Sequence, residues 1–378
     1  MLLGATLTTF FGYATLLPVV PLWAVRGGAS AFVGGTTTGV FMGITVLTQI
    51  AVPRLTRAVG YRWTFLLGAA LIGLPAPLYA LSDAAEPLLL ISALRGVGFG
   101  IITVCGSALV AELLPRAELG RGSGLYGVAV GVPQLLGVPA GIWVAEAWGY
   151  PAVFWAAGVL PVLGCLPAAL LPRVDGHAAP AGEVGGLLSQ LRPLLGPWLV
   201  MLAAALAYGA VVTFTPMSLA VAPVALLAVG AAMLAGRWAS GMVGDRMGVA
   251  GRQLPLSVLL GVSGLLAIAA AVAGDGPWLA VLGGLLFGAG YGVVQNDSLV
   301  AMFDRVPPHR YGMASAGWNI ALDGGYGLGA VLIGAVVSGP GFVAAFLVTA
   351  GLVLLTLAPA WYAARRAVTW GRASSRRS

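Results

Sequence analysis

Lysine is absent from this chain of 378 residues, so all 19 of its basic residues are arginine. A Walker A phosphate-binding loop requires a lysine, and so does the Schiff base of a retinal protein. Both ATP hydrolysis at such a loop and light-driven pumping are therefore excluded. If the protein moves a solute, the driving force comes from an ion gradient, from the solute's own gradient or from a partner.

Charged residues and the usual catalytic side chains are also scarce. Charged residues make up 8% of the chain, which has only two histidines and two cysteines. His177 and His309 fall between apolar runs, whereas Cys105 and Cys165 fall inside them without the spacing of a metal site. An enzyme should show a nucleophile with a base, or a metal cluster. The sequence therefore predicts no enzyme, no metal and no cofactor.

Hydrophobic sequence is what the chain has in abundance. Hydrophobic residues make up 59% of it and the mean hydropathy is +0.97, well above a soluble globular domain. A spanning helix needs about 20 mostly apolar residues, and these runs lack the alternation of barrel strands. We therefore predict an all-α polytopic membrane protein with twelve transmembrane helices. The predicted spans are residues 1–24, 31–53, 63–81, 87–113, 122–146, 151–171, 197–219, 222–243, 253–273, 277–303, 311–338 and 341–363.

The positions of the arginines predict the orientation. With a cytoplasmic N-terminus, sixteen arginines fall in inner loops and the C-terminal segment, and only Arg26 falls in an outer loop. This asymmetry places both termini in the cytoplasm. We expect the basic tail to contact anionic lipid of the bilayer, not nucleic acid. A composition without lysine and rich in Ala, Gly and Arg is typical of a bacterium with a GC-rich genome. We therefore expect the protein in a bacterial plasma (inner) membrane.

A polar stretch rich in Pro and Gly, residues 172–193, divides the twelve spans into two halves that share sequence. The stretch GYPAVF (149–154) recurs as GFVAAF (341–346), and RGVGFG (95–100) recurs as FGAGYG (287–292), both 192 residues later. Such repeats in a helical membrane chain are typical of secondary transporters. The predicted organisation is an N-terminal six-helix bundle (1–171), a cytoplasmic linker (172–196), a C-terminal six-helix bundle (197–364) and a basic cytoplasmic tail (365–378).

An aspartate and an arginine with glycines on both sides lie at the end of the eighth apolar run, in GMVGDRMG (241–248). This stretch resembles the G-x-x-x-D-R-x-G loop signature of the major facilitator superfamily. The resemblance implies two pseudo-symmetric six-helix bundles, a monomer, and a cytoplasmic gate that includes Gly241, Asp245, Arg246 and Gly248. We add Arg237, eight residues before Asp245, to this gate. The alternative is an ordinary charged turn that lies on the cytoplasmic side only because positive residues favour that side.

The corresponding loop of the first half, PRLTRAVG (53–60), departs from the signature. Arg57 stands where the aspartate belongs, and Ala58 stands where the arginine belongs. Arg95, followed by GVGFG, is similar to a second motif of the family. That resemblance implies a cavity-facing residue coupled to proton or substrate, and a structural arginine bonded to backbone carbonyls is the open alternative.

The deepest acidic residue of the expected spans is Asp323, which lies twelve residues beyond Tyr311. At 1.5 Å per residue this is ~18 Å into a core about 30 Å thick. Asn319 and Tyr326 lie on the same helical face. An acidic residue at this depth is costly, so we expect it to bind protons or substrate. A polar contact between helices is the alternative.

A second polar group, in QNDS (295–298), lies toward the cytoplasmic end of the tenth span. That span lines the cavity in the superfamily, so Gln295 or Asp297 is a candidate for solute contact. A cytoplasmic-end polar cluster with Asp304 and Arg305 is an equal alternative.

The predicted function is a secondary active transporter that exports a small drug-like or secreted metabolite in exchange for protons. Sparse charge, a single deep carboxylate and the Gly/Pro-rich fifth span with Pro133 and Pro139 favour this hypothesis. The alternative is a proton symporter that imports a sugar or an organic acid. A membrane-embedded enzyme or a receptor is a third and less favoured hypothesis.

Overall fold

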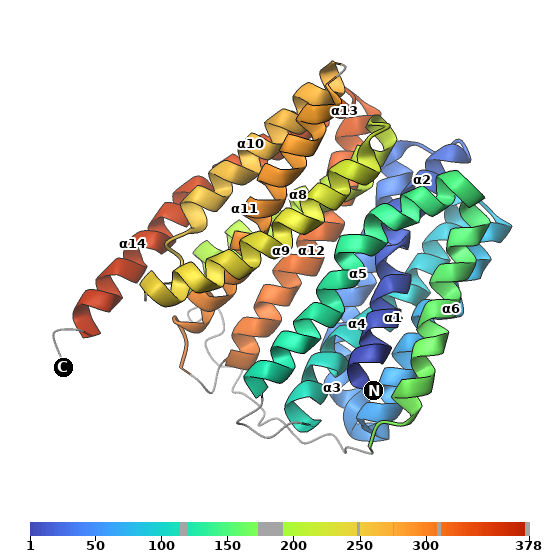
Figure 1. Cartoon of the computed structure of the whole chain (residues 1–378), viewed down its shortest axis with the longest axis horizontal. Coiled ribbons are helices and arrows are strands. Elements are labelled where there is room, and N and C mark those ends of the chain that lie inside the picture. Colours follow the sequence, from blue (N-terminus) through green and yellow to red (C-terminus); the bar gives the residue numbers. More distant parts are fainter. Residues whose placement is uncertain (114–118, 173–191, 248–249, 275, 308–310, 375–378) are drawn as a thin grey trace. The chain divides into compact units, whose positions relative to one another are not determined.

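The computed structural model describes residues 1–113, 119–172, 192–247, 250–274, 276–307 and 311–374, and within these ranges every regular element is a helix (Figure 1). The chain divides into two compact units, Met1–Gly182 (unit 1) and Glu183–Ser378 (unit 2). Unit 1 contains α1 (Leu2–Ala14), α2 (Leu16–Arg26), α3 (Ala31–Gly73), the 3-10 helix η1 (Ala76–Leu81), α4 (Ala85–Leu113), α5 (Leu119–Trp148) and α6 (Tyr150–Ala169). Unit 2 contains η3 (Arg192–Leu194), α8 (Leu195–Ser218), α9 (Ala222–Met247), α10 (Leu254–Ala273), α11 (Pro277–Phe303), α12 (Tyr311–Ser338), α13 (Phe342–Leu355) and α14 (Leu357–Ser374).

The described helices provide the spans that the hydrophobic runs predict. Eleven helical segments are long and apolar enough to cross a membrane, and one of them covers 51 residues, Ala31–Leu81. At 1.5 Å per residue that segment would be more than twice the roughly 30 Å of the hydrocarbon core. Gly60 breaks it, because its backbone is non-helical (φ 78°, ψ 162°). Counting it as two spans gives the twelve helices of the predicted all-α fold.

Two spans that we expected to be continuous are broken by proline. α1 ends at Ala14 and α2 begins at Leu16, and α13 ends at Leu355 where α14 follows after one residue. A proline ring clashes with the carbonyl four residues before it and removes a helical hydrogen bond. Pro18 and Pro359 each lie four residues after the helix end that they cause. α14 then continues as a helix to Ser374, into the segment expected as a tail.

The glycines repeated between the halves explain how the helices of each unit pack. In unit 1 the Gly96 and Gly100 positions face the carbonyls of Phe41 and Thr45 in α3. In unit 2 the Gly288 and Gly292 positions face the carbonyls of Val229 and Met233 in α9 in the same way. Small residues allow such close approach between membrane helices.

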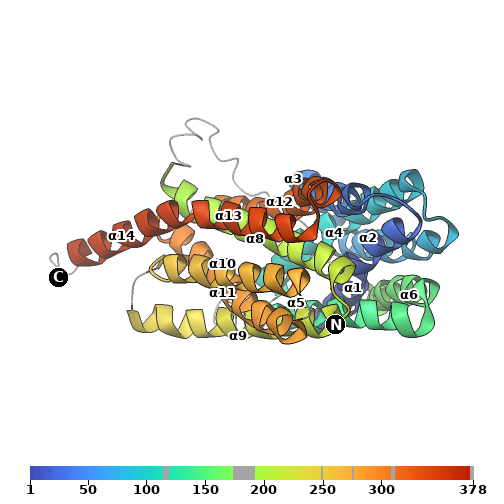
Figure 2. The ribbon, with the colours of Figure 1, turned by 90° about the horizontal axis from the view of Figure 1, so that it is seen from above.

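The middle glycine of each repeat faces the other neighbouring segment. A Cβ at Gly98 would lie 2.7 Å from the Gly68 carbonyl oxygen in the second part of α3. A Cβ at Gly290 would lie 2.6 Å from the Ser257 carbonyl oxygen in α10. α11 accordingly lies between α9 and α10 in both views (Figures 1 and 2). The G-x-G-x-G pattern thus places one helix between two others.

We expect Gly98→Ala to destabilise unit 1. Its Cβ would meet the Gly68 carbonyl oxygen at 2.7 Å and the Ile72 nitrogen at 2.8 Å, both backbone atoms. Such overpacking costs roughly 1–3 kcal/mol, more than the gain of about 1 kcal/mol in helix propensity. Gly43→Ala in α3 is the matched control, because nothing lies within 4 Å of its Cβ position. Thermal unfolding of the two purified variants should separate them, and equal midpoints would contradict this packing.

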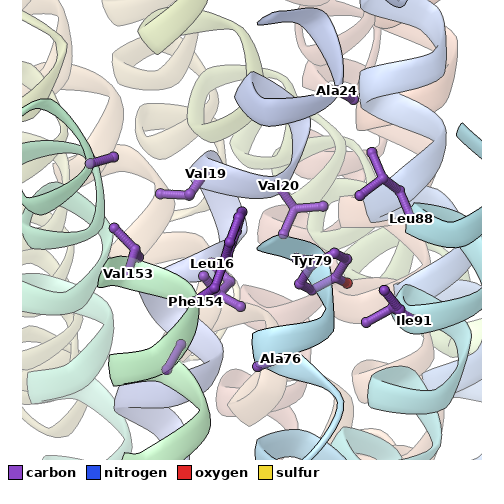
Figure 3. Packing of buried hydrophobic residues seen from close by; sticks show 12 residues of the cluster. Leu16, Val19, Val20, Ala24, Ala76, Tyr79, Leu88, Ile91, Val153 and Phe154 are labelled. Carbon is purple, nitrogen blue, oxygen red and sulfur yellow. The ribbon is translucent and has the colours of Figure 1, made fainter. Parts of the chain in front are cut away.

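A cluster of buried side chains in unit 1 lies where α2, η1, α4 and α6 meet. Val20 of α2, Tyr79 of η1, Leu88 of α4 and Phe154 of α6 are among its members (Figure 3). The Tyr79 and Phe154 rings lie 5.5 Å apart. The Tyr79 hydroxyl lies 2.8 Å from the Ser92 hydroxyl of α4. This cluster holds Tyr79 in place beside Arg95.

Candidate functional site

Arg95 of α4 is buried within unit 1, with 2% of its surface exposed. Its Nε donates to the Ile72 carbonyl oxygen and its Nη2 donates to the Gly12 carbonyl oxygen, both at 2.9 Å. The guanidinium also lies 5.8 Å from the centre of the Phe41 ring and 5.7 Å from that of Tyr79. Arg95 therefore links α1, α3 and α4, and its bonds to carbonyls fit the structural alternative as well as the functional one.

The same guanidinium borders a small cavity of about 20 Å³ in unit 1. Such a volume holds one or two groups of the size of water. Its apolar walls come from α2 and α3 and include Leu16, Val20 and Phe41. Its polar walls are Arg95 and hydroxyl-bearing residues of α1, α3, η1 and α4, namely Tyr13, Thr37, Thr38, Tyr79 and Ser92. The cavity is thus rich in hydrogen-bond donors.

Each unit contains a stacked aromatic pair, and Phe99 and Tyr291 of these pairs lie 192 residues apart, the spacing of the repeat. Tyr13 and Phe99 stack in unit 1 with centroids 3.9 Å apart, and Tyr208 and Tyr291 stack in unit 2 at 4.6 Å. Tyr326 of α12 lies 5.5 Å from Tyr208. Its hydroxyl is buried and has no hydrogen-bond partner among the described residues. The stacked pairs join the first span to the fourth in unit 1 and the seventh span to the tenth in unit 2.

A polar cluster surrounds the Tyr291 hydroxyl in unit 2. Arg237 Nη1 donates to Gln295 Oε1 at 3.4 Å, and Gln295 Nε2 contacts the Met233 sulfur at 3.8 Å. Gln295 hydrogen-bonds Tyr291, and the charges of Arg237 and Asp323 both act on that hydroxyl. The structure thus brings Gln295, which we predicted as a cavity residue, together with Arg237, which we predicted in the gate.

Asp323 of α12 is buried, with 7% of its surface exposed. The predicted companions of Asp323 on its helix face have other partners. Asn319 Nδ2 donates to the Ser315 carbonyl oxygen of its own helix at 2.9 Å, and Tyr326 packs on Tyr208. The predicted roles of Asp323, Asn319 and Tyr326 in proton or substrate binding stay predictions.

Asp297 of α11 is buried, and it binds the turn that precedes α10. Its Oδ1 accepts from the Gly251 amide at 2.7 Å and its Oδ2 accepts from the Gln253 amide at 2.8 Å. Gly251 has a positive φ of 84°, which only glycine adopts readily. The carboxylate also faces the positive end of α10. These contacts favour the structural alternative for Asp297 over solute contact.

The predicted gate is only partly described. Asp245 and Arg246 lie in the last turn of α9, but the Asp245 side chain and all of Gly248 lie outside the described residues. Gly241 of the predicted gate does not lie at a close helix contact, because a Cβ there would be 4.0 Å from its nearest neighbour, Asn296. Close approach in α9 occurs instead at Gly236, whose Cβ position lies 2.5 Å from the Ala289 carbonyl oxygen.

The packing also supports the alignment of the two loops. Phe41 and Val229 occupy equivalent places 188 residues apart, as do Thr45 and Met233. The same spacing places Arg57 at the position of Asp245. The gate itself stays a prediction.

Among the described residues no group of three or more His, Cys, Asp or Glu could hold a metal ion.

Comparison with known proteins identifies the class and then the family. The chain matches the family model of the Major Facilitator Superfamily over residues 2–329, and it belongs to this superfamily. Eleven helical segments among the described residues are long and apolar enough to cross a membrane, as this superfamily requires.

Curated relatives match only part of the chain. A probable multidrug-efflux transporter of Mycobacterium tuberculosis is 30% identical over 158 residues, which are 41% of this chain and 33% of that protein. An uncharacterised MFS-type transporter of Methanocaldococcus jannaschii is 22% identical over 161 residues, 43% of this chain and 42% of that one. The matches thus span about a third to two fifths of the relatives' length.

Solved structures match nearly the whole chain. The nucleoside transporter NupG superposes with a TM-score of 0.77 at 12% identity, covering 96% of this chain and 98% of its own. The xylose transporter XylE from E. coli superposes with a TM-score of 0.75 at 14% identity, covering 95% and 94%. At such identities these likenesses show the fold, and the fold is that of the superfamily.

Proposed function

We propose that this transporter exports a small amphipathic molecule across the bacterial plasma membrane in exchange for protons. The observation that carries the proposal is the buried carboxylate of Asp323. Proton coupling requires a titratable group within the spans, and both histidines lie between them. Asp323 and Asp297 are the buried acidic residues of the described chain. Because backbone amides engage both oxygens of Asp297, Asp323 is the better candidate.

Export is favoured by the character of the walls and by one relative. The residues that line the unit 1 cavity are mostly aromatic, aliphatic or hydroxyl-bearing, and Arg95 alone among them is charged. That composition suits an amphipathic solute better than a sugar, which would need more amide and carboxylate groups. The relative from M. tuberculosis, named a probable multidrug-efflux transporter, supports the same direction.

Inverted membrane vesicles with an acidic lumen test the direction and the coupling together. In such vesicles export runs into the lumen, and protons leave as solute enters. A panel of amphipathic dyes and organic acids is added, and the lumenal pH is followed with acridine orange. We expect at least one compound to release lumenal protons in vesicles that contain the protein, and not in vesicles without it. Uphill uptake into intact cells that an uncoupler abolishes, with no proton release in vesicles, would instead show import.

A further inference from the structure

We propose that the Arg95 cavity binds the anionic head group of the transported molecule, so that the substrates are amphipathic compounds with a single negative charge. This inference rests on the proposed function, because it takes the solute to be a small amphipathic molecule. It goes further in naming the charge that the site selects. Three observations on the described part of unit 1 carry it: a buried cation that contacts no carboxylate there, hydroxyl protons available for an acceptor, and a cavity of limited size.

The positive charge of Arg95 is buried but not neutralised. Its hydrogen bonds go to two backbone carbonyls and to the Tyr79 side chain, and its other neighbours are the aromatic residues Phe41 and Tyr13. No carboxylate is among the groups that contact it in the described part of the chain. A buried charge normally has a partner of opposite charge because burial without one is costly. An anion brought by the solute would supply that partner.

The remaining polar atoms of the cavity are hydroxyls that can donate to an anion. Thr38 is 5% exposed and lines the cavity, and its hydroxyl has no hydrogen-bond partner among the described residues. Tyr79 and Ser92 share one hydrogen bond between their hydroxyls, which leaves one of the two protons for another acceptor. A guanidinium and two further donors converging on one space fit a carboxylate, whose two oxygens accept only.

The size and the walls of the cavity limit what binds there. About 20 Å³ admits a head group and not a whole drug-sized molecule. The apolar walls formed by Leu16, Leu17, Val20 and Phe41 suit the carbon atoms next to that head group. One arginine balances one negative charge, so a dianion would bring an unpaired charge into the site. A cation would meet Arg95 with like charge.

Three ligands with the same ring and different charge test this inference directly. The purified full-length protein in lipid nanodiscs is titrated with 1-naphthoate, 1-naphthalenemethanol and 1-naphthylmethylammonium, and binding is followed by calorimetry. We expect naphthoate to bind about tenfold or more tightly than the alcohol, because charge-assisted hydrogen bonds exceed neutral ones. The ammonium compound should bind more weakly than both.

Variants separate anion binding from the structural role of Arg95. Arg95→Gln should remove the preference for naphthoate over the alcohol, whereas Arg26→Gln, at the exposed end of α2, should keep it. If Arg95→Gln does not fold, Thr38→Val preserves the shape and should still weaken naphthoate several-fold relative to the wild type. Unfolding midpoints without ligand show that each variant tested is folded.

Several results would overturn the inference. One is equal affinity of the three naphthalene compounds, and another is a preference for naphthoate that survives in both Arg95→Gln and Thr38→Val. A third is the absence of binding by naphthoate, benzoate and acetate alike, since their head groups are the same. Proton-coupled export of a cationic dye in the vesicle assay would refute the inference while leaving the proposed function standing.

Discussion

Asp323→Asn is expected to abolish solute accumulation driven by a proton gradient while leaving exchange of solute without a gradient largely intact. Asparagine keeps the size and most of the hydrogen-bonding capacity of the carboxylic acid, but it cannot take up and release a proton. A carboxylate that faces water on one side and then the other can carry one proton per cycle. Each charge that moves gains about 2.3 kcal/mol per 100 mV, which is enough to drive accumulation.

The measurement uses proteoliposomes that contain the purified variant. Uphill uptake under an imposed pH gradient and counterflow at equal pH are recorded on the same preparation, with the solute identified in the vesicle screen. Asp304→Asn is the matched control, because it removes a carboxylate of the same unit that is exposed at the end of α11. Uphill transport and proton movement that persist in Asp323→Asn would make Asp323 a structural polar contact.

Much of the fold follows from the sequence because a bilayer demands long apolar helices. The runs at 277–303 and 311–338 coincide with α11 and α12. The breaks within the first and last spans were not predicted, although Pro18 and Pro359 stand at the right distance to cause them. Over a long apolar run a proline can kink or break a helix, and neighbouring helices decide which.

The candidate sites are less predictable because their parts are distant in sequence. Arg95 is prominent as a charge in an apolar run, but Thr38 and Tyr79 are ordinary residues of other elements. Asp297 binds amides 46 and 44 residues away, and no spacing rule indicates that pairing. The alternatives for Arg95 and Asp297 could therefore be stated from the sequence, whereas the contacts favour the structural role for Asp297 and fit both roles for Arg95.

The repeat also shows where the two halves have diverged. The residue 192 positions after Arg95 is Phe287, which packs on Tyr291. Gly137 and Gly141 of α5 pack on the first span as Gly325 and Gly329 of α12 pack on α8, 188 residues later, and the residue 188 positions before Asp323 is Leu135. Unit 1 therefore carries a buried cation and unit 2 a buried acid at positions that the other unit fills with an uncharged residue. If both proposals hold, unit 1 recognises the charge of the solute and unit 2 couples its transport to protons.

Asp297→Ala is expected to destabilise the protein strongly rather than to alter solute affinity. The substitution leaves the amides of Gly251 and Gln253 without acceptors, and the first of these is buried. An unmade buried hydrogen bond costs about 1–3 kcal/mol, so the two together should cost roughly 2–5 kcal/mol. Asp297→Asn should lower the free energy of unfolding by about half as much, because its one carbonyl oxygen can still accept from one amide.

Hydrogen exchange and unfolding decide between the two interpretations of Asp297. In Asp297→Ala the amides of residues 250–253 should exchange faster than in the wild type, and the unfolding midpoint should fall, with Asn intermediate. Asp304→Asn, which removes an exposed charge near the same end of α11, should change neither. If Asp297→Ala instead keeps wild-type stability and exchange but loses solute binding, then Asp297 contacts the solute, and its bonds to the turn before α10 contribute little to the fold.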